Sequence, residues 1–227
     1  MKVKFSGIGV VDGRGKLNGT VFSRNRSGAI ARVKVTPINP NTASQQYSRT
    51  ILTALSQAWR SLSQEIILGW NSAVADFQTT DVFGDLRTPT GKNLYTKLNA
   101  NLVSVGASQI SEPPSPTIVA AVFADSISIS VGTPTYDLLF TGTDASVNYQ
   151  IWATPGLSAG ISFVSSEYRQ IGAFAGGAGS SFDFETLYLA KYGAPAIGSK
   201  VFLKMVPVNN TTGLKGIASS ASTIVVA

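Results

Sequence analysis

The sequence predicts an α+β protein in which an N-terminal basic β-arm and a helical hairpin precede an all-β, Ig-like sandwich. Three observations predict this: strand-like alternation between close glycines, then two apolar stripes at helical spacing, then about seven short apolar runs separated by turn residues. The expected domains are 1–35 for the basic Gly-rich β-arm, 36–110 for the helical domain, 111–116 for a Pro linker and 117–227 for the sandwich.

The arm is expected to form short strands joined by tight turns. Asp12-Gly13 and Asn18-Gly19 are hairpin dipeptides, because Asp, Asn and Gly tolerate positive φ. From Ala29 to Val35, small or apolar residues alternate with Ile30, Arg32 and Lys34, which is strand periodicity. The segment is too small and too basic to form a core alone, so we expect it to lie on another domain or subunit.

Positive charge is concentrated in this arm. Eight basic side chains and one acidic one lie in residues 1–40, a net charge of +7, against +6 for the whole chain. Such asymmetry favours an acidic partner surface or nucleic acid. Direct nucleic-acid binding is the less favoured interpretation, because Phe5 and Phe22 are the only aromatic residues there. The predicted partner-binding residues are Lys2, Lys4, Arg14, Lys16, Arg24, Arg26, Arg32 and Lys34.

The first helix is expected from about Ala43 to Leu62. Pro37 and Pro40 impose extended backbone on the residues before them, and Asn41 or Thr42 can cap the helix. Its apolar stripe follows i, i+3/i+4 spacing and consists of Tyr47, Ile51, Leu52, Leu55, Ala58, Trp59 and Leu62.

Ser63 is the expected cap of the second helix, with Glu65 favoured in its first turn by the helix dipole. Its stripe is Ile66, Ile67, Trp70, Ala73, Val74 and Phe77. Gly69 inside this helix costs about 1 kcal/mol relative to Ala, which predicts a close backbone contact there. A weaker third helix is expected over Lys92–Leu102. The predicted structural core residues are Trp59, Trp70, Leu55 and Phe77.

After the Pro linker, the chain reads as all-β. A short helix over Phe184–Tyr192 is an alternative between two of the strands. The expected strands are Ile118–Phe123, Ser126–Val131, Tyr136–Thr141, Val147–Ala153, Ile161–Ile171, Val201–Val208 and Ala218–Val226. This pattern of short strands and Gly, Pro and Asn turns is typical of an Ig-like or fibronectin-like sandwich.

Most catalytic constellations are excluded by composition. The chain has no His and no Cys, which removes thiolate nucleophiles, zinc–thiolate sites and histidine bases. Gly13-Arg-Gly15-Lys16 lacks the remaining residues of a phosphate loop. Asp81 and Asp85 flank Val-Phe-Gly in a loop that also holds Arg87, and they are interpreted as loop caps or as partners of an arginine. We therefore predict a protein that is not an enzyme and that has no catalytic residue, cofactor or metal.

Membrane insertion and secretion are not expected. The longest apolar run, Ile118–Ala124, is far shorter than the ~20 residues that span a bilayer. Gly and Asp interrupt the N-terminal apolar stretch, so it lacks a secretory signal. Charged residues are only 13% of the chain, well below the roughly 25% typical of soluble domains, which suggests that partners cover much of the surface.

A set of spaced residues covers most of the chain: Gly15-Lys-Leu-Asn-Gly19, Phe22-Ser-Arg-Asn, Thr36-Pro-Ile-Asn-Pro-Asn-Thr42, Gln45-Gln46, Arg49, Trp59-Arg-Ser-Leu62, Gly69-Trp70-Asn71, Phe83-Gly84-Asp85, Thr90-Gly91-Lys-Asn-Leu94, Ala153-Thr-Pro-Gly-Leu-Ser-Ala-Gly160, Tyr192-Gly-Ala-Pro195 and Asn209–Gly213. On these residues the chain resembles a family of tailed-bacteriophage virion structural proteins. The C-terminal pieces are similar to the Ig-like half of such proteins, whereas Glu65-Ile-Ile-Leu-Gly69 is more apolar than the family pattern.

The resemblance implies a virion component, present in many copies and assembled in the host cytoplasm. Our leading hypothesis is an auxiliary or decoration protein of the capsid, whose basic arm docks on acidic capsid or connector subunits. The alternatives are a tail or head–tail connector component, a DNA-packing protein whose affinity rests on Arg24, Arg26 and Arg32, and a carbohydrate-binding or adhesive module. The last would use sandwich loops near Trp152, Tyr168 and Phe174.

Overall fold

A computed structural model describes most of the chain, which groups into two compact units. The first unit is Met1–Ser48 with Thr79–Arg87, and the second is Arg49–Gln78 with Thr88–Ala227. The described residues are 2–4, 14–25, 28–81, 84–132, 134–142, 144–177 and 179–227. The helices after residue 48 and the sandwich thus share one unit, and the expected linker 111–116 lies within it.

The first unit contains a four-stranded antiparallel sheet in the order β1-β4-β3-β2. The predicted hairpin at Asn18-Gly19 joins β2 to β3, with Asn18 at a φ of 50°; the predicted Asp12-Gly13 turn lies outside the described residues. A second hairpin pairs β5 with β6. The strands are β1 (Lys2–Lys4), β2 (Gly15–Leu17), β3 (Thr20–Asn25), β4 (Gly28–Val33), β5 (Thr79–Thr80) and β6 (Leu86–Arg87).

The three predicted helices are present and begin at capping side chains. They are α1 (Ala43–Ser61), α2 (Gln64–Ala73), which runs on into a 3-10 turn (Val74–Phe77), and α3 (Gly91–Ser104). Oγ1 of Thr42 accepts a hydrogen bond from the Gln45 N–H at 3.4 Å, and Oγ of Ser63 accepts one from the Ile66 N–H at 3.4 Å. Both residues therefore satisfy N–H groups that the first helical turn leaves without a partner.

In the second unit, the helical core is centred on Tyr95 of α3. The ring centroid of Tyr95 lies 5.3 Å from that of Trp59 and 5.4 Å from that of Trp70. Leu55 and Trp70 are buried in this core, with Trp59 and Phe77 half-buried against it. The sequence-predicted core residues thus all contribute to one cluster.

Two details of the helix prediction are wrong. The apolar stripe of α1 is only partly buried, because Tyr47 and Leu52 are 57% and 54% exposed. The close backbone contact expected at Gly69 is absent, since a Cβ there would meet the Pro113 ring at 3.8 Å, an ordinary van der Waals distance.

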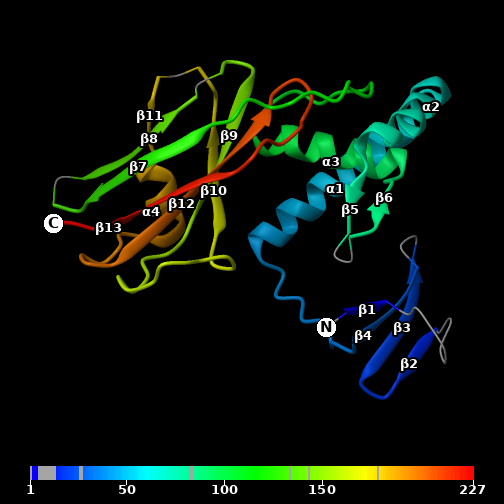
Figure 1. The fold of residues 1–227 in the computed structure, drawn as a ribbon, viewed down its shortest axis with the longest axis horizontal. Coiled ribbons are helices and arrows are strands. Elements are labelled where there is room, and N and C mark those ends of the chain that lie inside the picture. Colours follow the sequence, from blue (N-terminus) through cyan, green and yellow to red (C-terminus); the bar gives the residue numbers. More distant parts are fainter. Residues whose placement is uncertain are drawn as a thin grey trace. The chain divides into compact units, whose positions relative to one another are not determined.

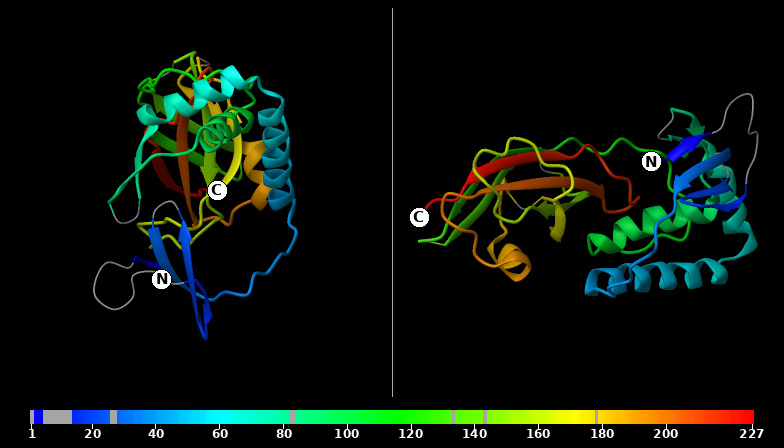
Figure 2. Two further views of the ribbon diagram at one scale, coloured as in Figure 1. Left: turned by 90° about the vertical axis from the view of Figure 1, so that its right-hand side faces the viewer. Right: turned by 90° about the horizontal axis from the view of Figure 1, so that it is seen from below.

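Residues from β7 to the C-terminus form an Ig-like sandwich of two antiparallel sheets (Figures 1 and 2), ordered β10-β9-β12-β13 and β11-β8-β7. Alternate residues such as Ile129, Leu138, Ile151 and Leu203 face the interior and share one core, as expected for packed sheets. The elements are β7 (Phe123–Ser130), β8 (Thr135–Thr141), β9 (Val147–Ala153), β10 (Arg169–Phe174), β11 (Ser181–Asp183), α4 (Glu185–Tyr192), β12 (Lys200–Asn209) and β13 (Ser219–Ile224).

Two predicted strands differ from those observed. The strand expected at Ile118–Phe123 begins only at Phe123, and Ile118 is fully exposed. The strand expected at Ile161–Ile171 starts at Arg169, so residues 161–168 are a loop. Apolar residues in these stretches resemble strand patterns, but none of the strands in the described part of the chain pairs with them. The alternative helix near Phe184–Tyr192 is confirmed as α4.

Hydrogen bonds tie α3 to the sandwich within the second unit. The side-chain amide of Asn101 donates to the Gly213 carbonyl at 2.8 Å, and that of Asn148 donates to the Val105 carbonyl at 3.2 Å. Nε2 of Gln150 donates to Oγ of Ser104. The end of α3 therefore lies against the outer side of β9 and the turn after β12.

At Gly213, the packing of α3 against the sandwich leaves no room for a side chain. Its φ is +72°, and a Cβ would lie 2.4 Å from the Leu98 carbonyl oxygen. We expect Gly213→Ala to lower the free energy of unfolding by about 2–4 kcal/mol, from left-handed strain plus the clash. Gly198→Ala is the matched control, because Gly198 has a φ of +81° but open space around it. It should cost only the left-handed strain, about 1–2 kcal/mol. Equal losses in urea unfolding would contradict the clash.

Candidate functional site

The basic residues of the arm are presented to solvent. Arg14, Lys16, Arg24, Arg32 and Lys34 are all exposed. Among the other predicted partner-binding residues, Lys2 and Lys4 are described as β1 backbone only, and Arg26 lies outside the described residues. The exposed set is consistent with a surface that meets an acidic partner.

The register of the strands determines on which face of the sheet each of these basic side chains lies. Lys16 is opposite Val21, and Val21 is opposite Arg32. Residues directly opposite on neighbouring strands share a face, so Lys16 and Arg32 flank Val21 on one side, which we call the basic face. Arg24 has the other parity along β3 and lies on the opposite face. The predicted patch is therefore not continuous.

The opposite face of the same sheet carries exposed apolar side chains. Leu17 and Val33 are both opposite Thr20, and they are 69% and 55% exposed. Among the described residues of the first unit, Ile30 is the one buried apolar side chain. This sheet therefore exposes apolar side chains to water, and a partner could cover them.

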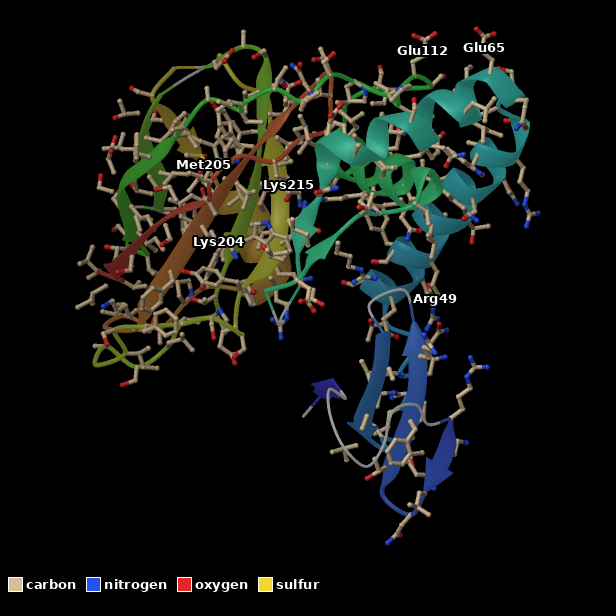
Figure 3. The ribbon with its side chains drawn as sticks, turned by 45° about the vertical axis from the view of Figure 1, so that its right-hand side comes forward. Arg49, Glu65, Glu112, Lys204, Met205 and Lys215 are labelled. Carbon is tan, nitrogen blue, oxygen red and sulfur yellow. The ribbon has the colours of Figure 1, made fainter. Side chains whose placement is uncertain are left out.

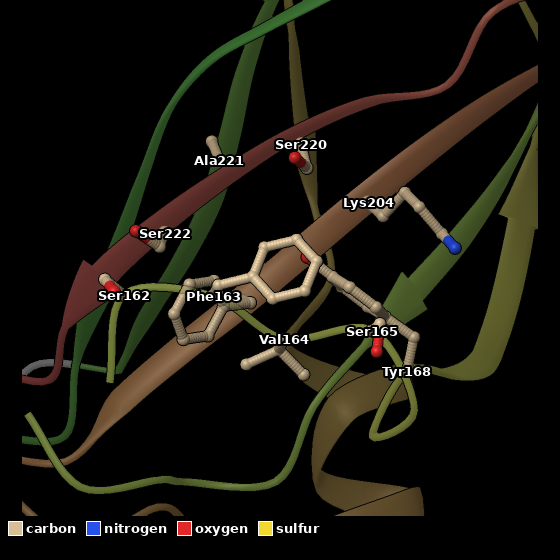
Figure 4. A pocket seen from close by; sticks show the side chains of 10 residues that line it. Ser162, Phe163, Val164, Ser165, Tyr168, Lys204, Ser220, Ala221 and Ser222 are labelled. Carbon is tan, nitrogen blue, oxygen red and sulfur yellow. The ribbon is translucent and has the colours of Figure 1, made fainter.

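A second candidate site is a hollow on the outer side of the sandwich (Figure 4). It has a volume of about 460 Å³ and lies over β12, between β13 and the loop of residues 162–168. The residues that define its chemistry are Ser162, Phe163, Tyr168, Lys204, Ser220 and Ser222. We call it the Lys204 hollow.

Lys204 is held between aromatic rings at the end of this hollow. Its Nζ lies 4.6 Å from the Tyr168 ring centroid and 5.2 Å from that of Trp152, within the range of cation–π attraction. Strand pairing fixes this arrangement, because Trp152 of β9 is directly opposite Lys204 of β12. Burial raises the pKa of Tyr168, and a hydrogen bond with the Ser220 side chain opposes that rise.

Further lysines extend the positive charge beyond the hollow. The pKa of Lys215 is lowered, first by packing around its amine and then by repulsion from Lys97 and Lys204. The residue as a whole remains exposed, and Figure 3 shows Lys204 and Lys215 on neighbouring stretches of the sandwich. An anion placed here would relieve mutual repulsion among these amines.

Of the three aromatic residues predicted to form a contact surface, two lie together and the third does not join them. Trp152 and Tyr168 do come together, but Phe174 belongs to the sandwich core, where its ring stacks on Phe182 with centroids 4.1 Å apart. Phe163, which is 80% exposed, was missed because the alternation around it resembles a strand. Its position between serines and polar residues was the available signal for a loop.

The Asp81 carboxylate caps the turn of the β5–β6 hairpin. Oδ1 of Asp81 accepts a hydrogen bond from the Asp85 N–H at 3.2 Å, and the Asp81 carbonyl accepts one from the Gly84 N–H. Within the described ranges, no group of three or more acidic side chains is arranged to hold a metal ion. None of the helices there combines the length and the apolar character needed to cross a bilayer.

No family model and no curated protein matches the chain. Among solved structures, it is similar to an Fn3-like protein from Clostridium thermocellum, with 14% sequence identity and a TM-score of 0.30. The match covers 49% of this chain and 95% of that one. The description of the sandwich therefore rests on its own strands and core.

Proposed function

We propose that this chain is a non-enzymatic structural protein of a tailed-bacteriophage virion, an auxiliary or decoration protein of the capsid. Its basic arm docks on an acidic subunit, and the Ig-like sandwich is the module that the arm attaches to the particle. The virion setting comes from the sequence resemblance. The single structural observation that supports docking is the exposed sheet of the first unit. Lys16 and Arg32 lie on one face, and exposed Leu17 and Val33 lie beside Arg24 on the other.

Each face suits a different part of an interface. Lys16 and Arg32 on the basic face favour a carboxylate-bearing surface and speed encounter with it. Contact with a partner would remove the side chains of Leu17 and Val33 from water. Burial of this apolar surface would contribute to the affinity. The edge strands of this sheet, β1 and β2, also offer backbone groups for strand addition.

Limited trypsin digestion tests the dependence of the arm on a partner. In the free protein, we expect the first cuts at exposed Arg14, Lys16, Arg24, Arg32 and Lys34, leaving a fragment that starts near residue 35. Lys204 and Lys200 are half-buried in β12 of the sandwich and should be cut later. In assembled particles, the arm should resist digestion. If the arm resisted trypsin equally well in the free monomer, its sheet would not need a partner to become ordered, and this would contradict the proposed docking.

A further inference from the structure

We propose that the Lys204 hollow is a binding site for an acidic saccharide, a pyranose chain that bears carboxylates. The site does not depend on a place in a virion, because its residues all belong to the second unit. The hollow has about 460 Å³ of space, within the range of roughly 300–1,000 Å³ that small-molecule sites occupy.

The hollow offers an uncovered aromatic ring. Phe163 is 80% exposed and stands in the loop that borders the hollow (Figure 4). The C–H face of a pyranose is a flat apolar surface that can stack on such an exposed phenyl ring. Trp152 is not the platform, because Lys204 already lies over its ring.

The remaining lining supplies hydrogen bonds and one charge. Ser162, Ser165, Ser220 and Ser222 bring four hydroxyl groups, each able to donate to and accept from sugar hydroxyls. Lys204 is the cation, and no carboxylate is found among the described residues that line the hollow. The Tyr168 and Trp152 rings hold its amine in place without neutralising it.

The positive surroundings favour an acidic sugar over a neutral one. Lys97 and Lys204 both repel Lys215, and this repulsion adds to the burial that lowers the pKa of Lys215. A carboxylate bound at Lys204 would reduce this repulsion. Single-stranded nucleic acid fits less well, because it requires several cations along the backbone beside stacking rings. The hollow itself has one lysine against four serines.

The test is a titration of the full-length protein with polygalacturonate, alginate and hyaluronate at low salt, with neutral dextran and oligo-dT as comparison ligands. We expect binding to at least one acidic polysaccharide, with dextran and oligo-dT clearly weaker. Phe163→Ala and Lys204→Met should each weaken that binding by about tenfold. Methionine keeps most of the stem that packs on the rings, so loss of binding in this variant would report the charge.

Matched controls lie elsewhere on the sandwich. Leu139→Ala removes an exposed apolar side chain from β8 on the other sheet, and Lys191→Met removes an exposed lysine from α4. Both should bind like the unmodified protein. The proposal is overturned if none of the three acidic polysaccharides binds, if oligo-dT binds more tightly, or if the controls weaken binding as much as the hollow variants do.

Discussion

Replacing Trp70 with alanine is expected to lower the free energy of unfolding of the second unit by about 3–5 kcal/mol. Trp70 is fully buried, and its ring meets Tyr95 edge-on at a centroid distance of 5.4 Å. Its Nε1 also donates to the Ser111 carbonyl at 2.6 Å. Truncation therefore leaves a large cavity and removes the hydrogen bond that fastens the start of the Pro-rich segment.

Two variants separate these contributions. Trp70→Phe retains most of the ring volume but loses the hydrogen bond, and it should cost about 1–3 kcal/mol. Leu68→Ala on the same helix is the control, because Leu68 is 58% exposed, and it should change stability by less than about 0.5 kcal/mol. Urea unfolding followed by tryptophan fluorescence and circular dichroism measures all three. A Trp70→Ala loss no larger than the Leu68→Ala loss would show that the helical core is not organised around Trp70.

Charge reversal on the basic face is expected to abolish docking in virions. Lys16→Glu combined with Arg32→Glu places one carboxylate on each side of Val21. Each introduced glutamate would repel the carboxylates of an acidic partner that the native lysine or arginine attracts. Like-charge contacts at an interface cost several kcal/mol of binding free energy. We expect the number of incorporated copies, measured by quantitative mass spectrometry of purified particles, to fall at least about tenfold.

The control for this variant changes the charge by the same amount outside the arm. Lys191→Glu with Arg60→Glu reverses two exposed cations of α4 and α1, and incorporation should stay at the level of the unmodified chain. Equal losses for both double variants would mean that overall charge, and not the basic face, governs incorporation.

The helices were the most predictable part of the fold. Local signals determine them: Thr42 and Ser63 cap α1 and α2 as predicted, and the stripe spacing identifies Leu55 and Trp70 as core residues. The strands β9 and β12 were equally clear, because strict alternation marks sheets with one buried face. The turn at Asn18-Gly19 also follows from local chemistry.

Long-range pairing explains what the sequence could not supply. Whether residues 161–168 form a strand depends on the presence of a neighbouring strand, and periodicity alone does not contain that information. The same limit applies to Phe174, whose place in the core depends on Phe182 in another strand. The division of the arm cations between two faces follows from the register of β2, β3 and β4. The Lys204 hollow requires β9, β12, β13 and a loop to converge.

Cryo-electron microscopy of intact virions would show whether the basic arm docks in a phage particle. We expect density for this chain on the icosahedral shell, with Lys16 and Arg32 against carboxylates of a neighbouring subunit. A ring at the portal or along the tail would favour the connector or tail alternative, because a closed ring has cyclic symmetry whereas a decoration protein follows the capsid lattice. If the chain were absent from the particle, the proposed virion role would be wrong.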